Sequence, residues 1–239
     1  MTVFKYALWR GLKNPASLIM NCAMPLLLVI FNFEFGGFGA AAAVGDEAVH
    51  SRTPFLVALM LMFGAFVMAR SIQVDKMDGT ITRILAGPVT MRGYLVQNFM
   101  SAMVPMTVLS IALGIIGVAL HSWEISFALG LAICYILLSA TSIGLSFVWS
   151  CLFKDKETST AVLSVLITAI ASLGGLMIPL ALLPRFLRFL GALFPAHWAT
   201  RALENLMDYG MNTQFWLSML AMFLFTVAYL LYGGKRRII

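Results

Sequence analysis

Six long apolar segments dominate this chain of 239 residues, of which 61% are hydrophobic and 11% charged. A helix needs about 20 mostly apolar residues to cross a bilayer. The segments are 17–35, 53–71, 94–120, 125–152, 158–180 and 214–233. They are continuously apolar and do not alternate in polarity, which favours helices over the strands of a barrel. The sequence therefore predicts an all-α, polytopic membrane protein with six transmembrane helices in one domain over residues 1–239.

The basic residues predict the orientation. Twelve of the 16 lysines and arginines lie before the first segment, at the second-to-third and fourth-to-fifth connections, and after the sixth: Lys5, Arg10, Lys13, Arg70, Lys76, Arg83, Arg92, Lys154, Lys156, Lys235, Arg236 and Arg237. The other four lie on the opposite side: Arg52, Arg185, Arg188 and Arg201. Positive charge concentrates on the cytoplasmic side. We therefore expect both termini in the cytoplasm and a location in the cell inner (plasma) membrane.

Several classes of function and processing are disfavoured. The net charge of +6 is a topology signal, because no basic patch interleaved with aromatic residues predicts a nucleic-acid partner. The alanines at 40–43 resemble a signal-peptide cleavage site, but they come too late after too long an apolar run, so we expect no cleavage.

Catalytic and metal chemistry are not expected of this chain. It contains no GxxxxGK[ST] phosphate loop, so it does not hydrolyse ATP alone. The histidines are scattered, and the three cysteines form no CxxC pair, which predicts apolar packing and no disulfide, metal or catalytic site. The cysteines are Cys22, Cys134 and Cys151, and the histidines are His50, His121 and His197.

The N-terminal residues 1–14 have an amphipathic pattern. Apolar side chains recur every four residues, with Trp9 beside them, at Phe4, Leu8 and Leu12. The basic residues occupy the other arc: Lys5, Arg10 and Lys13. This pattern predicts a helix lying in the cytoplasmic interface in contact with membrane lipid. The alternative is a leader that only sets the topology.

The connection over residues 73–92 is the most distinctive polar segment. Gly79 and Pro88 bracket a predicted helix of about two turns, with Asp75 and Asp78 at or before its positive end. One face of this helix is apolar, carrying Ile81, Ile84 and Leu85. That face must dock on lipid or on a partner, or else pack on its own bundle.

Two stripes of small hydroxyl residues follow the fourth and fifth segments. The first comprises Ser139, Ser142, Ser146 and Ser150, and the second comprises Thr160, Ser164, Thr168 and Ser172. Such stripes allow helices to approach closely, which is the structural interpretation of either one. The alternative is a wall that faces a substrate.

Several prolines interrupt the chain between the fifth and the last apolar segment. Residues 181–198 are too short to span a membrane, so we expect them to form a re-entrant or interfacial segment on the outer face.

Together these features resemble the ABC type-2 transporter permeases. That family has an acidic–basic–acidic pattern, Gly-Thr, and then an arginine- and leucine-containing stretch ending in proline in its first cytoplasmic loop. The matching residues here are Asp75, Lys76, Asp78, Gly79, Thr80, Arg83, Leu85 and Pro88, with aspartates where glutamates are more usual. Residues 183–184 and 193–198 resemble the family's outer segment before its last span. The resemblance covers essentially the whole chain.

The resemblance implies half of an ATP-driven exporter for a hydrophobic or amphipathic cargo such as a drug, lipid or peptide. Two permeases, identical or paralogous, would form the membrane unit, and separate nucleotide-binding ATPase subunits would carry ATP and magnesium. The coupling contact would comprise Asp75, Asp78, Gly79, Thr80, Ile81, Arg83, Ile84, Leu85 and Pro88. The stripe from Thr160 to Ser172 would line the translocation path. The alternative is a non-transporting membrane scaffold or sensor that docks a cytoplasmic partner through residues 73–92.

Overall fold

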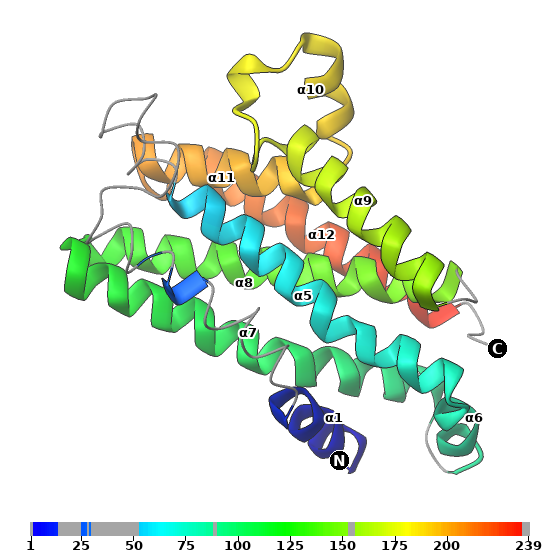
Figure 1. Ribbon diagram of the computed structural model, residues 1–239. Coiled ribbons are helices and arrows are strands. Elements are labelled where there is room, and N and C mark those ends of the chain that lie inside the picture. The colour runs from blue at the N-terminus through cyan, green and yellow to red at the C-terminus, as the bar shows by residue number, and fades with distance from the viewer. Residues whose placement is uncertain are drawn as a thin grey trace.

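In the computed structural model, residues 2–13, 25–27, 29, 53–87, 90–152 and 156–235 are described, and these ranges contain helices and turns but no strand. The elements are α1 (Thr2–Lys13), α5 (Thr53–Met77), α6 (Thr80–Leu85), α7 (Met91–His121), α8 (Ile125–Leu152), α9 (Lys156–Gly174), the 3-10 helix η2 (Leu180–Leu182), α10 (Arg185–Gly191), α11 (Pro195–Tyr209) and α12 (Thr213–Lys235). The prediction of an all-α fold is confirmed for this part of the chain (Figure 1).

Helix α8 is the centre of the bundle. It contacts α5, α7, α11 and α12. In its most apolar stretch 72% of the residues are buried, against 33% in α7 and 28% in α12. The outward sides of α7 and α12 carry apolar side chains that no described part of the chain covers, such as Val108 and Leu224. Hydrocarbon lipid can accept such side chains without the cost that water imposes.

The serine stripe of α8 faces its neighbours in the bundle. Ser139, Ser142 and Ser146 are buried. The hydroxyl of Ser142 donates to the carbonyl of Leu138 at 2.7 Å, and that of Ser146 donates to the carbonyl of Ser142 at 3.0 Å. Hydroxyls bonded to their own helix need no partner elsewhere and leave a narrow surface. The packing interpretation therefore fits this stripe.

Three described helices are long and apolar enough to cross a membrane. They are α7 over Met91–Leu120, α8 over Ile125–Trp149 and α12 over Thr213–Tyr232. Shorter apolar stretches lie in α5 and α9, over Thr53–Ala65 and Val162–Gly174. The first predicted segment, 17–35, lies outside the described residues apart from 25–27 and 29. The count of six transmembrane helices stays a prediction.

Two predicted boundaries are wrong. The segment predicted over 158–180 ends as a helix at Gly174, because Gly175 adopts φ +94, a conformation that terminates helices and suits glycine. The amide of Leu176 then bonds back to the carbonyl of Ala171 at 3.0 Å. Conversely, the helix predicted to end at residue 71 continues to Met77, since nothing in residues 72–77 breaks a helix.

The outer segment predicted over 181–198 also has a wrong boundary, because residues 195–198 begin a longer helix. Helix α11 starts at Pro195 and runs to Tyr209, and it buries Ala196, Ala199 and Ala202. It contacts α8, α9 and α12. Cys134 of α8 is buried on the same contact, with its sulfur 3.9 Å from the carbonyl oxygen of Ala199, as a packing residue. In contrast, α10 projects from the bundle beside α9 (Figure 1).

The α9–α11 contact depends on a missing side chain. A Cβ built on Gly174 would lie 2.5 Å from the Cβ of Ala196 and 2.9 Å from the backbone nitrogen of His197. Both neighbours belong to the first turn of α11 and cannot rotate away. The two helices can therefore approach this closely only because residue 174 is glycine.

We expect Gly174→Ala to destabilise the protein by about 1–3 kcal/mol, since overpacked methyl groups force helices apart. Gly11→Ala is the matched control, because a Cβ at Gly11 meets nothing within 4 Å, and there alanine gains up to about 1 kcal/mol of helix propensity. Thermal unfolding of the detergent-solubilised protein measures both. Equal unfolding temperatures for the two variants would contradict the close α9–α11 contact.

Candidate functional site

The short helix α6 connects α5 to α7 at one end of the bundle. The amide of Asp78 still bonds to the carbonyl of Val74 at 3.0 Å, and Gly79 then reverses the chain with φ 66 and ψ 11. The hydroxyl of Thr82 donates to the carbonyl of Gly79 at 2.6 Å, which holds the first turn of α6 on that glycine. The helix predicted between Gly79 and Pro88 is confirmed as Thr80–Leu85, while Pro88 lies outside the described residues.

The other end of α6 is closed by its own backbone. The amide of Ala86 bonds to the carbonyl of Thr82 at 3.1 Å, and the amide of Gly87 to that of Ile84 at 3.1 Å. Helix α7 then starts with a capping residue, since the hydroxyl of Thr90 accepts from the amide of Gly93 at 3.2 Å. Two long bundle helices therefore flank a compact connection.

The apolar face of α6 packs on its own chain. Ile81 is only 3% exposed and belongs to the hydrophobic core, and Ile84 and Leu85 are half-buried against that core. Helix α5 runs further than predicted and, with the core, covers this face. The burial of Ile81 therefore fits the alternative that this face packs on its own bundle, and the assignment of Ile81 to the coupling contact stays a prediction.

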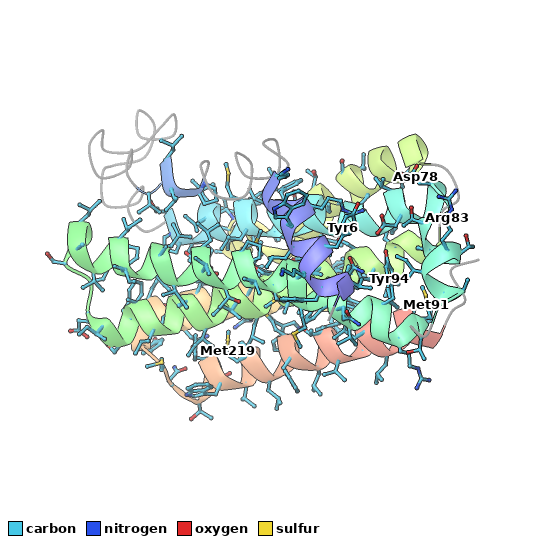
Figure 2. The ribbon with its side chains drawn as sticks, turned by 90° about the horizontal axis from the view of Figure 1, so that it is seen from below. Tyr6, Asp78, Arg83, Met91, Tyr94 and Met219 are labelled. Carbon is cyan, nitrogen blue, oxygen red and sulfur yellow. The ribbon has the colours of Figure 1, made fainter. Side chains whose placement is uncertain are left out.

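What α6 leaves exposed is its polar side. The exposed residues of the connection are Asp78, Thr82, Arg83, Ala86 and Gly87, while Gly79 and Thr80 are half-buried. Figure 2 shows Asp78 and Arg83 at the same end of the bundle, on the segment between α5 and α7. Any partner that reaches α6 from solvent meets one carboxylate, one guanidinium and one hydroxyl rather than an apolar stripe.

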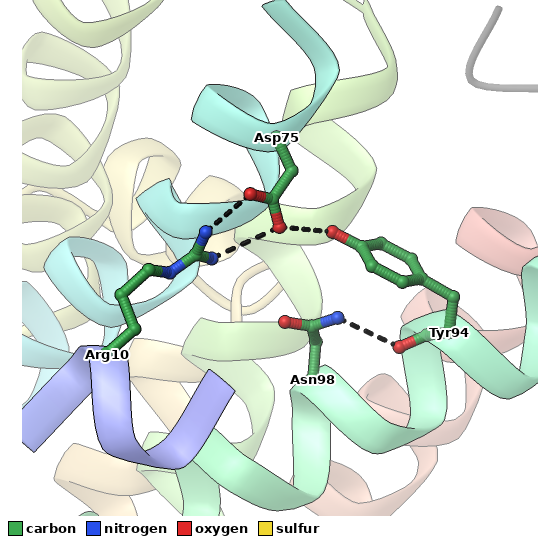
Figure 3. Close-up of polar contacts among 4 residues, drawn as sticks. All are labelled: Arg10, Asp75, Tyr94 and Asn98. Atoms are coloured by element: carbon green, nitrogen blue, oxygen red, sulfur yellow. Dashed lines mark hydrogen bonds and ion pairs between the residues drawn. The ribbon is translucent and has the colours of Figure 1, made fainter. Parts of the chain in front are cut away.

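Asp75 lies in a different environment from the rest of this set. It is on the last turn of α5, 6% exposed, and its carboxylate is shared by two other segments (Figure 3). Nη1 of Arg10, from α1, donates to Oδ1, and Nη2 donates to Oδ2 at 3.1 Å. The hydroxyl of Tyr94, from α7, donates to Oδ2 at 2.6 Å. Asn98 supports Tyr94 by donating to its carbonyl at 3.0 Å.

This arrangement is a satisfied buried charge. A carboxylate removed from water is costly unless it is paired and hydrogen-bonded, and here a bidentate guanidinium and a phenol supply both. Burial works against the charged form of Arg10, but the hydrogen bond and the charge of Asp75 outweigh it, so the pKa of Arg10 is raised. Asp75 therefore joins α1, α5 and α7 and does not face outward.

Sequence reasoning assigned neither Arg10 nor Tyr94 to this site. It placed Arg10 on the exposed arc of α1 with the lysines, whereas the structure turns Arg10 inward. A usable signal was present: an aspartate on a predominantly apolar helix needs a cation nearby, and the N-terminal helix carries three.

The hydroxyl stripe of α9 occupies a separate face. Ser164 and Thr168 are exposed and Ser172 is half-buried, whereas the side chain of Thr160 lies outside the described residues. Thr168 donates to the carbonyl of Ser164 at 2.9 Å, and Ser172 to that of Thr168 at 2.8 Å. Val165 beside them is 71% exposed. Helix α5 contacts both α6 and α9, and so connects the two candidate sets.

Comparison with known families decides the identity of the bundle. The family described as ABC-2 family transporter protein matches residues 43–234. The chain belongs to the ABC-2 transporter family. No curated protein is similar enough to count as a match. The match runs from before α5 to the next-to-last residue of α12, and therefore includes both α6 and the α9 stripe, whereas α1 lies before it.

Family membership and the apolar helices make this chain a multi-pass membrane protein of a transporter family. ABC-2 permeases are membrane subunits that normally work with an ATP-binding subunit. The residues that the sequence assigned to coupling and to the path stay predictions. What the structure adds is their environment: a polar exposed side of α6, a buried Asp75 and an exposed stripe on α9.

We expect Asp75→Asn to destabilise the protein by about 1–3 kcal/mol, because it leaves a half-buried guanidinium without its charge partner. Tyr94→Phe should cost about 1–2 kcal/mol for one lost hydrogen bond to a charged group. The double variant Arg10→Met/Asp75→Leu should recover much of the loss, since apolar groups can replace a buried pair. Thermal unfolding in detergent measures these variants together with the single variants Arg10→Met and Asp75→Leu. A double variant that loses the sum of its two single-variant effects would refute the pairing.

Proposed function

We propose that this chain is the membrane-spanning permease subunit of an ABC exporter, which moves a hydrophobic or amphipathic cargo outward. ATP hydrolysis on separate nucleotide-binding subunits, which hold ATP and magnesium, drives the movement. The observation that carries the proposal is α6, a short helix anchored by buried Ile81 between two long bundle helices and exposed at Asp78, Thr82 and Arg83. A second permease copy, identical or paralogous, completes the membrane unit.

The proposed coupling step uses the exposed side of α6 as the contact with the ATPase. With both termini in the cytoplasm of a cell inner membrane, α6 lies on the side where ATP is available. Because Ile81 anchors α6 in the core, a displacement of α6 by closing ATPase subunits moves α5 and α7 with it. The bundle changes state only if the partner binds one state more tightly than the other. Arg83 and Asp78 supply charges through which that preference can act.

The proposed translocation path includes the stripe of α9: Thr160, Ser164, Thr168 and Ser172. In this proposal a second permease copy faces it. Thr168 and Ser172 donate their protons to the carbonyls one turn back, so the face presents small side chains with satisfied donors. Such a wall accepts an apolar or amphipathic cargo without a buried charge, which agrees with the class of cargo proposed.

The experiment that tests the function begins with purification from the native membrane in mild detergent. A stoichiometric nucleotide-binding subunit that hydrolyses ATP is expected to copurify. In that complex Arg83→Glu should lower permease-dependent ATP hydrolysis at least several-fold, because it reverses a charge on the coupling surface. Its unfolding temperature should change little, because exposed substitutions usually fall within about 0.5 kcal/mol.

The matched control is Arg185→Glu, an exposed arginine in α10, outside residues 73–92. It should leave hydrolysis near the wild-type rate. An equal loss of ATP hydrolysis in both variants would show that the effect depends on overall charge and not on α6. A chain that copurifies with no ATPase under conditions that preserve complexes would favour the scaffold or sensor alternative.

The stripe is tested with Ser164→Leu and Thr168→Val. If the stripe lines the path, these variants should change the cargo concentration needed for half-maximal transport several-fold, with little change in unfolding temperature. Ser142→Ala in the buried stripe of α8 is the control, and it should change stability but not cargo response. Lower stability with an unchanged cargo response for the α9 variants would assign that stripe to packing.

A further inference from the structure

Helix α1 lies across the long helices in the half of the bundle that carries α6, and it contacts α7 and α5 (Figures 1 and 2). One arc of α1 faces away from the bundle. It carries Lys5, Tyr6, Trp9 and Lys13, all exposed, with Tyr6 at 60% and Trp9 at 57%. Positions 5, 9 and 13 repeat every four residues and share one side of a helix, and position 6 lies beside them.

This lysine–aromatic arc differs from the amphipathic pattern read in the sequence. Trp9 lies with the lysines rather than with Phe4 and Leu8, which are half-buried. The ammonium of Lys13 lies 3.7 Å from the ring centroid of Trp9. Lys13 and Trp9 therefore form a joint cationic and aromatic surface.

The chemistry of the arc fits a lipid headgroup layer. Helix α1 has no acidic residue, so nothing on the helix neutralises its lysines. Indole and phenol rings prefer the depth where headgroups meet hydrocarbon. Lysines near an anionic leaflet gain attraction that a zwitterionic surface does not supply. A soluble acidic partner would match the lysines but not the two large rings between them.

We propose that the lysine–aromatic arc of α1 binds anionic phospholipid headgroups, and that Arg10 links this lipid-bound helix to the base of α6 through Asp75. The lipid contact is independent of the proposed function, whereas the effect of that contact on coupling rests on the proposed function. Neither Lys5 nor Lys13 takes part in the Asp75 contacts, so the lysines can be replaced without removing that ion pair. Arg10 also lies over the ring of Tyr6, 5.7 Å from its centroid, and so touches both surfaces of α1.

Two contacts fix α1 to the bundle. The guanidinium of Arg10 holds Asp75, which is four residues before Gly79, the residue that precedes α6. The amide of Phe4 donates to Oε1 of Gln97 on α7 at 3.2 Å. A headgroup layer that sets the depth of α1 therefore also sets the position of the last turn of α5 and the first turns of α7, from which α6 is suspended.

The lipid contact is tested by hydrogen exchange of residues 2–13 in nanodiscs of phosphatidylcholine with increasing phosphatidylglycerol. The anionic lipid should protect α1 in the wild-type protein. Lys5→Gln/Lys13→Gln should shift the midpoint to higher phosphatidylglycerol or abolish the protection, since each lysine near an anionic surface contributes about five-fold in affinity. Arg185→Gln/Arg201→Gln, which removes two exposed cations elsewhere, should leave the midpoint unchanged.

Three results would overturn the lipid contact. They are no protection by phosphatidylglycerol, the same midpoint in the lysine variant and the wild-type protein, or equal protection by inorganic phosphate in pure phosphatidylcholine. The last result would identify a general anion surface rather than a lipid one.

The link to α6 is tested on the complex with its ATPase in the same nanodiscs. Phosphatidylglycerol should raise hydrolysis in the wild-type complex. The increase should be lost in Arg10→Met/Asp75→Leu, although the lipid still protects α1 in that variant. An increase that survives in this variant would overturn the link and leave the lipid contact standing. If no ATPase binds the chain, the proposed function fails and the link fails with it, while the exchange experiment still decides the lipid contact.

Discussion

The carboxylate of Asp75 imposes a constraint on the end of the bundle that carries α6. A buried carboxylate must be paired, and its partners here come from α1 and α7, which lie far from α5 in the sequence or on the other side of α6. Once Arg10 and Tyr94 converge on it, the last turn of α5 and the first turn of α7 have a fixed separation. The connection that bridges this fixed separation contains the six-residue helix α6.

The proposed coupling role places two demands on α6, a helix of six residues. It must be attached firmly enough to transmit a displacement, and it must expose a surface that a partner can bind. Ile81 meets the first by entering the core, and Arg83 the second by remaining exposed. An apolar docking face would have placed both demands on the same side chains. The division between a buried anchor and a polar exposed side removes that conflict.

The sequence predicted the elements better than their surroundings. Gly79 predicted α6 correctly, because a left-handed glycine is a local signal. The end of α9 at Gly174 was also a local signal, but the apolar residues that follow masked it. The burial of Ile81 and the inward turn of Arg10 could not be read locally. Both depend on which helix lies alongside, and the apolar period of α6 fits a partner groove as well as the core of its own chain.

The two hydroxyl stripes also show that a sequence pattern does not tell which helix lies alongside it. Their different surroundings bear on function. Both repeat every three or four residues, and both bond hydroxyls to the carbonyls one turn back. In α8 Ser139, Ser142 and Ser146 are buried on a helix that contacts α5, α7, α9, α11 and α12, whereas in α9 Ser164 and Thr168 are exposed. The pattern defines a narrow surface whose bonded hydroxyls donate to their own helix, with Ser139 Oγ as a buried exception that has no partner among the described residues, and the neighbours decide its use. In the proposed function, the exposed surface of this kind on α9, which α5 connects to α6, is the one that faces a second permease copy or a cargo.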